Sequence, residues 1–174
     1  MGLDMYLERM PRVRGCTAQQ ICAVNDYFDK YEHKSIIEDV GYWRKANAIH
    51  KWFVDNIQDS KDDCGYYEVA PEQLEELLNI CKLIKQKCVL KKGKIANGYR
   101  FENGKEVPII EDGEYIENPE VAAEYLPTQS GFFFGGTEYD QWYMKNIEST
   151  IEILTKVLKE TDFDNQMVVY TASW

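Results

Sequence analysis

Alternation of apolar and polar residues predicts a strand at the start of the chain. Leu3, Met5 and Leu7 alternate with polar residues, which predicts a strand over residues 2–8 that ends at residues 10–11. Other apolar runs predict three further strands, over residues 64–69, 131–136 and 167–173. Because the first strand starts almost at the first residue, the N-terminal segment is expected to be held from the outset.

Apolar residues that recur every three or four positions predict two long helices. The first begins at Pro71, and its predicted buried face consists of Leu74, Leu77, Leu78, Cys81, Ile84 and Cys88. The second follows Thr137 and Asp140, which form a capping-box pattern. Its predicted face consists of Tyr139, Tyr143, Ile147, Ile151, Leu154 and Leu158.

Two shorter helices follow from capping patterns. Thr17 and Gln20 form a capping box that begins a helix reaching about Lys30. Its predicted buried stripe consists of Ile21, Val24, Tyr27 and Phe28. Asn118 precedes a proline and begins a short helix that stops by Pro127.

Turn signals predict a β-hairpin insertion at about residues 91–117. Asn-Gly or Asp-Gly pairs occur at 97–98, 103–104 and 112–113. A hairpin of this kind serves as a lid, as a contact with another subunit or as decoration, and the sequence leaves all three open. The order of elements predicts one α+β domain over residues 1–174. We expect a mostly antiparallel or mixed sheet packed with four to five helices.

The segment 41–57 carries the most informative pattern. Read as a helix, it has a core face formed by Tyr42, Ala46, Ile49, Phe53 and Ile57. Trp43, Asn47 and His50 follow one another at helical spacing on the neighbouring stripe. An indole, a carboxamide and an imidazole that open together to solvent would suit a planar polar ligand. The segment is therefore the predicted binding site.

His50 has three interpretations. It is a hydrogen-bonded histidine at the edge of the core, a contact to a ligand, or a general base oriented by Asp4 or Asp140. No serine or cysteine is placed by the sequence as a nucleophile beside it. The sequence therefore favours binding over catalysis, and leaves enzymatic activity open.

Basic residues are the candidates for pairing with an anion. Arg9, Arg12 and Arg14 form a local cluster that is either a solvated loop or a phosphate clamp. Arg44 and Lys45 adjoin the predicted site but project elsewhere on a helix, so bends or neighbouring segments would have to bring them in.

A second candidate region precedes the last long helix. Trp142 falls off the predicted apolar stripe, so its indole is expected to be exposed and able to stack on a ligand. Gly135, Gly136 and Thr137 lie between a predicted strand and helix, where free backbone N–H groups attract anions. A plain tight turn explains them equally, because no Walker or dinucleotide-binding motif is present.

The net charge of −10 excludes broad binding to duplex nucleic acid, because an acidic surface repels phosphates. One acidic run, a solvated face or a mimic of DNA, consists of Glu111, Asp112, Glu114, Glu117, Glu120 and Glu124. A small basic pocket for an anionic metabolite stays compatible with this charge.

The five cysteines have no Cys-x-x-Cys spacing and predict reduced thiols. Only His33 and His50 could add imidazole ligands, so we expect no metal and no cofactor. No signal peptide and no membrane-spanning segment are recognised. The sequence therefore predicts a cytoplasmic protein that does not bind membranes.

Four motifs resemble a group of uncharacterised proteins from phages and prophage-bearing bacteria. They are the opening Met-Gly-Leu-Asp-Met-Tyr-Leu, the block Val-Gly-Tyr-Trp-Arg-Lys-Ala-Asn-Ala-Ile-His-Lys-Trp-Phe, the run Gly-Phe-Phe-Phe-Gly, and the closing Tyr-Thr-Ala-Ser-Trp. The resemblance spans nearly the whole chain but carries no known activity. It implies counter-defence in a host cytoplasm, by sequestering a signal nucleotide or by blocking a host protein.

Three hypotheses follow from the sequence. The leading one is non-catalytic binding of a small anionic, nucleotide-like ligand, in which Trp43 or Trp142 stacks on its ring. The second is an inhibitor that binds a host protein through the acidic surface and the hairpin. The third is a nucleotide hydrolase or transferase that uses His50 as its base. A site shared between subunits would add a homo-oligomer to each of them.

Overall fold

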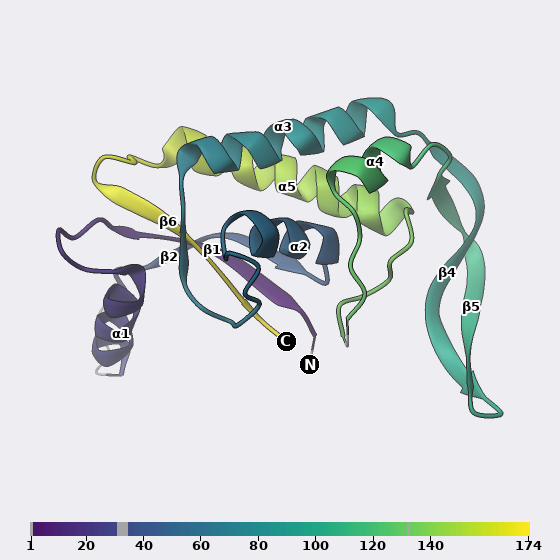
Figure 1. Ribbon diagram of the computed structural model, residues 1–174, viewed down its shortest axis with the longest axis horizontal. Helices are drawn as coiled ribbons and strands as arrows, with labels where there is room; N and C mark the ends of the chain where they lie inside the picture. Colours follow the sequence, from purple (N-terminus) through teal and green to yellow (C-terminus); the bar gives the residue numbers. More distant parts are fainter. Residues whose placement is uncertain (1, 31–34, 132) are drawn as a thin grey trace.

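The computed structural model describes residues 2–30, 35–131 and 133–174. Its main sheet has four antiparallel strands in the order β2-β1-β6-β3 (Figure 1). These strands are β1 (Asp4–Pro11), β2 (Glu38–Arg44), β3 (Tyr67–Val69) and β6 (Gln166–Ser173). The first and last strands, β1 and β6, are the two central ones, so the strand predicted near the start of the chain lies inside the sheet.

The two faces of the sheet follow from strand alternation. Met5 pairs with Ala172 and Leu7 with Tyr170, and these four side chains enter the larger core. The other face carries a smaller cluster formed by Met10, Ala18, Ile21, Cys22, Met167 and Val169. Every residue of β6 from Met167 to Ala172 is buried because both faces of this strand are covered.

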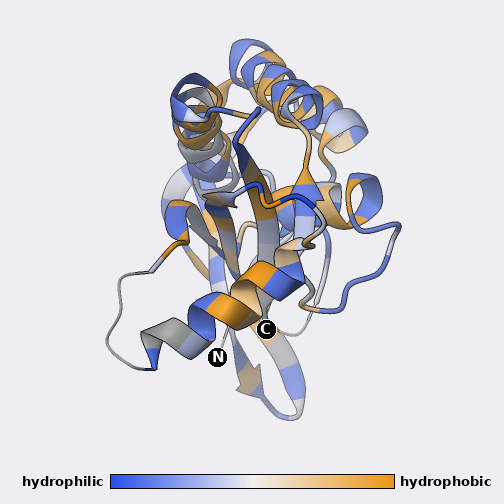
Figure 2. Cartoon of the chain, turned by 90° about the vertical axis from the view of Figure 1, so that its left-hand side faces the viewer, coloured by the Kyte–Doolittle hydropathy of each residue, from blue (hydrophilic) through white to orange (hydrophobic). Residues whose placement is uncertain are grey.

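The described residues form five helices, which cover the sheet unequally. They are α1 (Ala18–Asp29), α2 (Asn47–Asn56), α3 (Pro71–Lys87), α4 (Glu120–Tyr125) and α5 (Gln141–Glu160). Helices α2, α3 and α5 supply the larger core, whereas α1 packs alone against the smaller cluster. Figure 2 shows α1 apart from the paired helices α3 and α5 at the top of the view. The described helices and antiparallel sheets confirm the predicted α+β fold.

The predicted hairpin is present as β4 (Leu90–Glu102) and β5 (Lys105–Ile116). These strands pair antiparallel in a sheet of their own, with a register shift between Ala96 and Tyr99. Figure 1 shows the hairpin extending from the body beside α4 and α5. Its base is attached where Ile116 donates a backbone hydrogen bond to Tyr139.

Several local predictions are confirmed by hydrogen bonds and burial. The backbone N–H of Thr17 donates to the side chain of Gln20, and the backbone N–H of Gln20 donates to the hydroxyl of Thr17. The predicted face of α3 is buried, including Cys81, whose pKa burial raises to about 12. All five cysteines are free thiols. No helix in the described ranges is long and apolar enough to cross a membrane.

The helix predicted over 41–57 is wrong in its first half. Residues up to Arg44 belong to β2, and α2 begins only at Asn47. A Cβ on Gly41 would lie 2.6 Å from a side-chain carbon of Ile153, so glycine at this position lets α5 pack closely against β2. Between strand and helix, Lys45 has a φ of 58° and reverses the chain.

Two other predictions also fail. In α1, Val24 and Tyr27 are exposed rather than buried, because the helix contacts only one end of the sheet. The strand predicted over 131–136 is a loop in its described residues: Phe133 is exposed with a positive φ, and only Phe134 enters the core. The side chain of Phe28, the whole of Phe132 and His33 lie outside the described residues.

Candidate functional site

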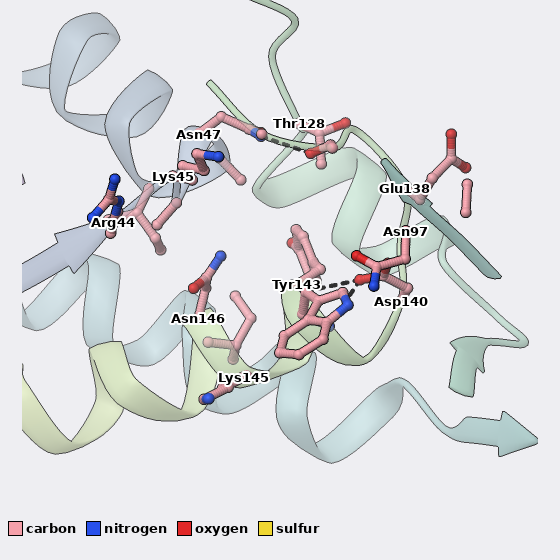
Figure 3. A pocket seen from close by; sticks show the side chains of 18 of the residues that line it. Arg44, Lys45, Asn47, Asn97, Thr128, Glu138, Asp140, Tyr143, Lys145 and Asn146 are labelled. Atoms are coloured by element: carbon pink, nitrogen blue, oxygen red, sulfur yellow. Dashed lines mark hydrogen bonds between the residues drawn. The ribbon is translucent and has the colours of Figure 1, made fainter. Parts of the chain in front are cut away.

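A cavity of about 590 Å³ lies where four segments of the chain meet. Residues 44–49 join β2 to α2, and residues 96–99 lie at the irregular part of β4. The loop before α5 and the first two turns of α5 complete the wall (Figure 3). Of the predicted site residues, six line this cavity: Arg44, Lys45, Asn47, Gly135, Gly136 and Trp142.

Three cationic side chains line the cavity, although the chain has a net charge of −10. Arg44 lies at 4.0 Å from Asp4, a loose ion pair, and its side chain is exposed. Lys45 and Lys145 form no ion pair with any residue in the described ranges. Two of the three cationic side chains at the cavity are therefore free to pair with an anion.

Trp142 supplies an exposed aromatic surface at the cavity. Its side chain is 47% exposed, as predicted from its place off the helical stripe. The ammonium of Lys145 lies 5.6 Å from the ring centroid, in a cation–π contact. Tyr99 of the hairpin, also half exposed, lines the cavity as a second aromatic residue.

The charges are separated along the cavity. Figure 3 shows Arg44 and Lys45 at one end and Glu138 and Asp140 at the other. Asn97 lies at the acidic end, so the hairpin contributes a carboxamide there. One end of the cavity is thus cationic, and the other end carries carboxylates and a carboxamide that can accept hydrogen bonds.

Lys45 and Gly135 lie close together in the wall of the cavity. Both have positive φ values, 58° and 92°. A Cβ on Gly135 would lie 3.0 Å from the Cβ of Lys45 and 3.2 Å from its carbonyl oxygen. Glycine is therefore required by conformation and by space. Left-handed non-glycine residues such as Lys45 cost stability and cluster at functional sites.

Asn47 is a structural clamp, which differs from its predicted role of contacting a ligand. Its carboxamide donates to the carbonyls of Phe134 and Gly136 at 3.2 and 2.8 Å, and accepts from the backbone N–H of Gln129 at 3.0 Å. The side chain is buried. These bonds fasten the loop before α5 to the first turn of α2.

His50 is sealed inside the core, which contradicts the prediction that it opens to solvent beside Trp43 and Asn47. It is fully buried, with Nδ1 at 2.7 Å from the hydroxyl of Tyr170 and Nε2 at 3.2 Å from a carboxylate oxygen of Asp62. Burial lowers its pKa, and the nearby Asp62 carboxylate opposes that shift. Both ring nitrogens are hydrogen-bonded, and the imidazole does not line the cavity.

Trp43 is also buried rather than exposed, because its strand faces α5. Its indole N–H donates to the hydroxyl of Thr150 at 2.9 Å, and its ring lies 6.2 Å from that of Phe53. Of the two tryptophans predicted to contact a ligand, Trp142 is the one exposed at the cavity. The three residues share no helical stripe, because Trp43 lies on β2 and Asn47 and His50 lie on α2.

The N-terminal arginines lie away from the cavity. Arg9 pairs with Glu38 and donates to the carbonyl of Glu160, and Arg12 pairs with Glu68. Arg9 is five residues along β1 from Asp4, a separation of roughly 17 Å in an extended strand. The predicted clamp of Arg9, Arg12 and Arg14 is therefore not assembled at the cavity.

The N-termini of α5 and α2 are capped differently from the prediction, which changes the helix start that can attract an anion. Helix α5 is capped by Asp140, which accepts from the backbone N–H groups of Trp142 and Tyr143, so Thr137 is not its cap. Helix α2 has no side-chain cap, and its first turn lines the cavity. The anion-attracting helix start at this site is thus that of α2 rather than α5.

The sequence analysis did not predict the cavity residues that come from the hairpin or those that lie on α5 outside its predicted apolar face. Asn97, Tyr99, Lys145 and Asn146 all line the cavity. The Asn-Gly pair at 97–98 signalled a turn, but only the docking of the hairpin against the body places it at the site. Within the described part of the chain, no three histidine, cysteine or acidic residues are grouped as metal ligands.

Comparison of the chain with protein-family models, with curated proteins and with solved structures gives no match.

Proposed function

We propose that the cavity binds a small anionic ligand that carries a planar ring, with the size and charge of a nucleotide. The carrying observation is the combination of the exposed Trp142 indole with Arg44, Lys45 and Lys145 in one cavity of an acidic protein. The ring stacks on Trp142, and the anionic group lies at the cationic end.

The dimensions and the backbone support this proposal. A volume of about 590 Å³ lies in the range of small-molecule sites. The uncapped first turn of α2 adds the positive end of a helix dipole beside Lys45. Strain at Lys45 is consistent with a residue kept in place for binding.

The role we propose is binding without catalysis. His50, the base of the hydrolase or transferase hypothesis, is buried and has both nitrogens occupied. Because His50 does not line the cavity, it supports no proton transfer to a ligand bound there, and binding is the favoured interpretation. Sequestration of a signal nucleotide in a host cytoplasm, as the resemblance to phage proteins implies, stays a prediction that no family match supports.

Calorimetry with a panel of nucleoside monophosphates, diphosphates and cyclic dinucleotides tests the proposal. Trp142→Ala should weaken binding by roughly 5- to 150-fold, because stacking contributes about 1–3 kcal/mol per base. Tyr125→Ala is the matched control, since Tyr125 is exposed to a similar degree but lies outside the cavity.

The cationic end is tested separately. Lys45→Asn removes the charge while keeping a residue that tolerates a positive φ. It should weaken every phosphate ligand, and the effect should shrink at high salt. Lys82→Gln, an exposed lysine of α3, should leave binding unchanged. The proposal is refuted if no member of the panel binds, or if both control variants weaken binding as much as their partners.

A second candidate is binding of a host protein through the hairpin. Tyr99, Phe101, Pro108 and Ile110 lie on one face of the β4–β5 pair, and all four are exposed, Phe101 at 75%. Exposed apolar patches of this kind occur at protein interfaces.

Deleting the whole hairpin cannot separate the two candidates, because residues 96–99 also line the cavity. Phe101→Ser can, since Phe101 is near the tip and outside the cavity. Lost capture of a host protein with intact nucleotide binding would favour the second candidate. Unchanged capture of the host protein by the Phe101→Ser variant would contradict the second candidate.

A further inference from the structure

We infer that the site selects a ligand ring that carries an exocyclic amino group. It should therefore prefer guanine over hypoxanthine and cytosine over uracil. This inference rests on the proposed function. The juxtaposition behind it is the pair of carboxylates, Glu138 and Asp140, at the end of the cavity opposite Arg44 and Lys45 (Figure 3).

The two carboxylates still have accepting capacity. Asp140 uses one oxygen, Oδ1, for the backbone N–H groups of Trp142 and Tyr143, at 2.8 and 3.1 Å. Its second oxygen accepts no hydrogen bond from the described residues. Glu138 is exposed and forms no ion pair with any residue in the described ranges. Glu138 is thus able to accept from a bound ligand, and Asp140, which is buried but lines the cavity, keeps one free oxygen there.

Trp142 lies next to an acidic residue along the chain and next to a cationic side chain in space. Trp142 follows Asp140 by two positions, and Lys145 contacts its ring at 5.6 Å. In our proposal, a ring stacked on Trp142 points one edge toward the acidic end of the cavity, and its phosphate extends toward the lysines. Asn97 adds a carboxamide at the same end, able to donate and to accept.

The hydrogen-bond chemistry of the bases decides the preference. Guanine presents a ring N–H and an amino group next to each other, and cytosine presents an amino group, so each can donate to a carboxylate. Hypoxanthine lacks the amino group of guanine. Uracil replaces the amino group of cytosine with a carbonyl, which a carboxylate repels. Carboxylates at this end therefore select for amino-bearing bases.

Two matched ligand pairs test the inference by calorimetry on the intact protein. GMP should bind at least about tenfold more tightly than IMP, and CMP more tightly than UMP, because hydrogen bonds to charged groups are the stronger ones. Glu138→Gln should reduce both ratios. Glu152→Gln, an exposed acid farther along α5, should leave them unchanged.

The outcomes separate this inference from the proposed function. Lys45→Asn should weaken all four nucleotides equally and leave the ratios intact, because it acts on the phosphate end. Binding of all four with equal affinity would overturn the inference and leave the proposed function standing. A preference that persists unchanged in Glu138→Gln would also overturn it. No binding of any nucleotide would overturn both.

Discussion

Replacing Asn47 with alanine should destabilise the protein even without a ligand. The side chain donates two hydrogen bonds, to Phe134 and Gly136, and accepts one from Gln129. Each such bond has a net worth of about 1 kcal/mol, and a buried group left without its partner adds to the loss. We therefore expect the free energy of unfolding to fall by about 3 kcal/mol. That is a large share of the roughly 5–15 kcal/mol typical of a folded protein.

Urea unfolding, followed by tryptophan fluorescence and by circular dichroism, measures this loss. The midpoint should fall while the slope of free energy against urea stays constant, since the change removes contacts rather than altering the surface exposed on unfolding. Coincidence of the two probes would confirm that unfolding is two-state.

Asn146→Ala is the matched control, because Asn146 lines the same cavity but its side chain makes no hydrogen bond with the described residues. Its effect should stay within about 0.5 kcal/mol. A loss below about 1 kcal/mol in Asn47→Ala would refute the clamp. Unchanged stability together with abolished ligand binding would instead restore Asn47 to the role of a ligand contact.

Three further changes test other parts of the structure. Gly135→Ala should cost at least about 1–2 kcal/mol, because alanine is strained at a φ of 92° and meets Lys45, and thermal unfolding would measure the loss. The pKa of His50 is lowered by burial below its usual 6.5, so its contribution to stability is complete above that pH and declines as the pH falls toward the folded-state pKa. An NMR titration that finds the imidazole pKa above 6.5 would contradict this account. Burial, with Asp39 and Asp26 nearby, raises the pKa of Glu8, and its Oε2 has no hydrogen-bond partner. Glu8→Gln should therefore stabilise the protein at pH 7, and the gain should vanish as the pH falls through the folded-state pKa of Glu8 to below 4.5, which unfolding curves at several pH values would reveal.

Elements with one strong local pattern were predicted well. The face of α3 needed only its stripe of apolar residues and a proline at its first turn. The hairpin needed only Asn103 and Gly104 between two β-prone runs. In both cases a pattern of residues close together in the chain is enough to predict the element.

The segment 41–57 shows where such reasoning ends. Tyr42 and Trp43 satisfy the spacing of a helix and the propensity of a strand equally. Pairing of β2 with β1, which is distant in sequence, selects the strand. As a result, the side chain of Trp43 points into the core, and α2 begins at Asn47, beside the cavity.

The sequence by itself determined the α+β fold class, the helix α3, the hairpin and the exposure of Trp142, because each follows from residues close together in the chain. Only the tertiary structure decided which polar residues share a site. Hydrogen bonds across the fold bury His50 and Asn47, and docking of the hairpin brings Asn97 to the cavity. Such contacts join residues far apart in the chain, and their energy depends on packing that local spacing does not record.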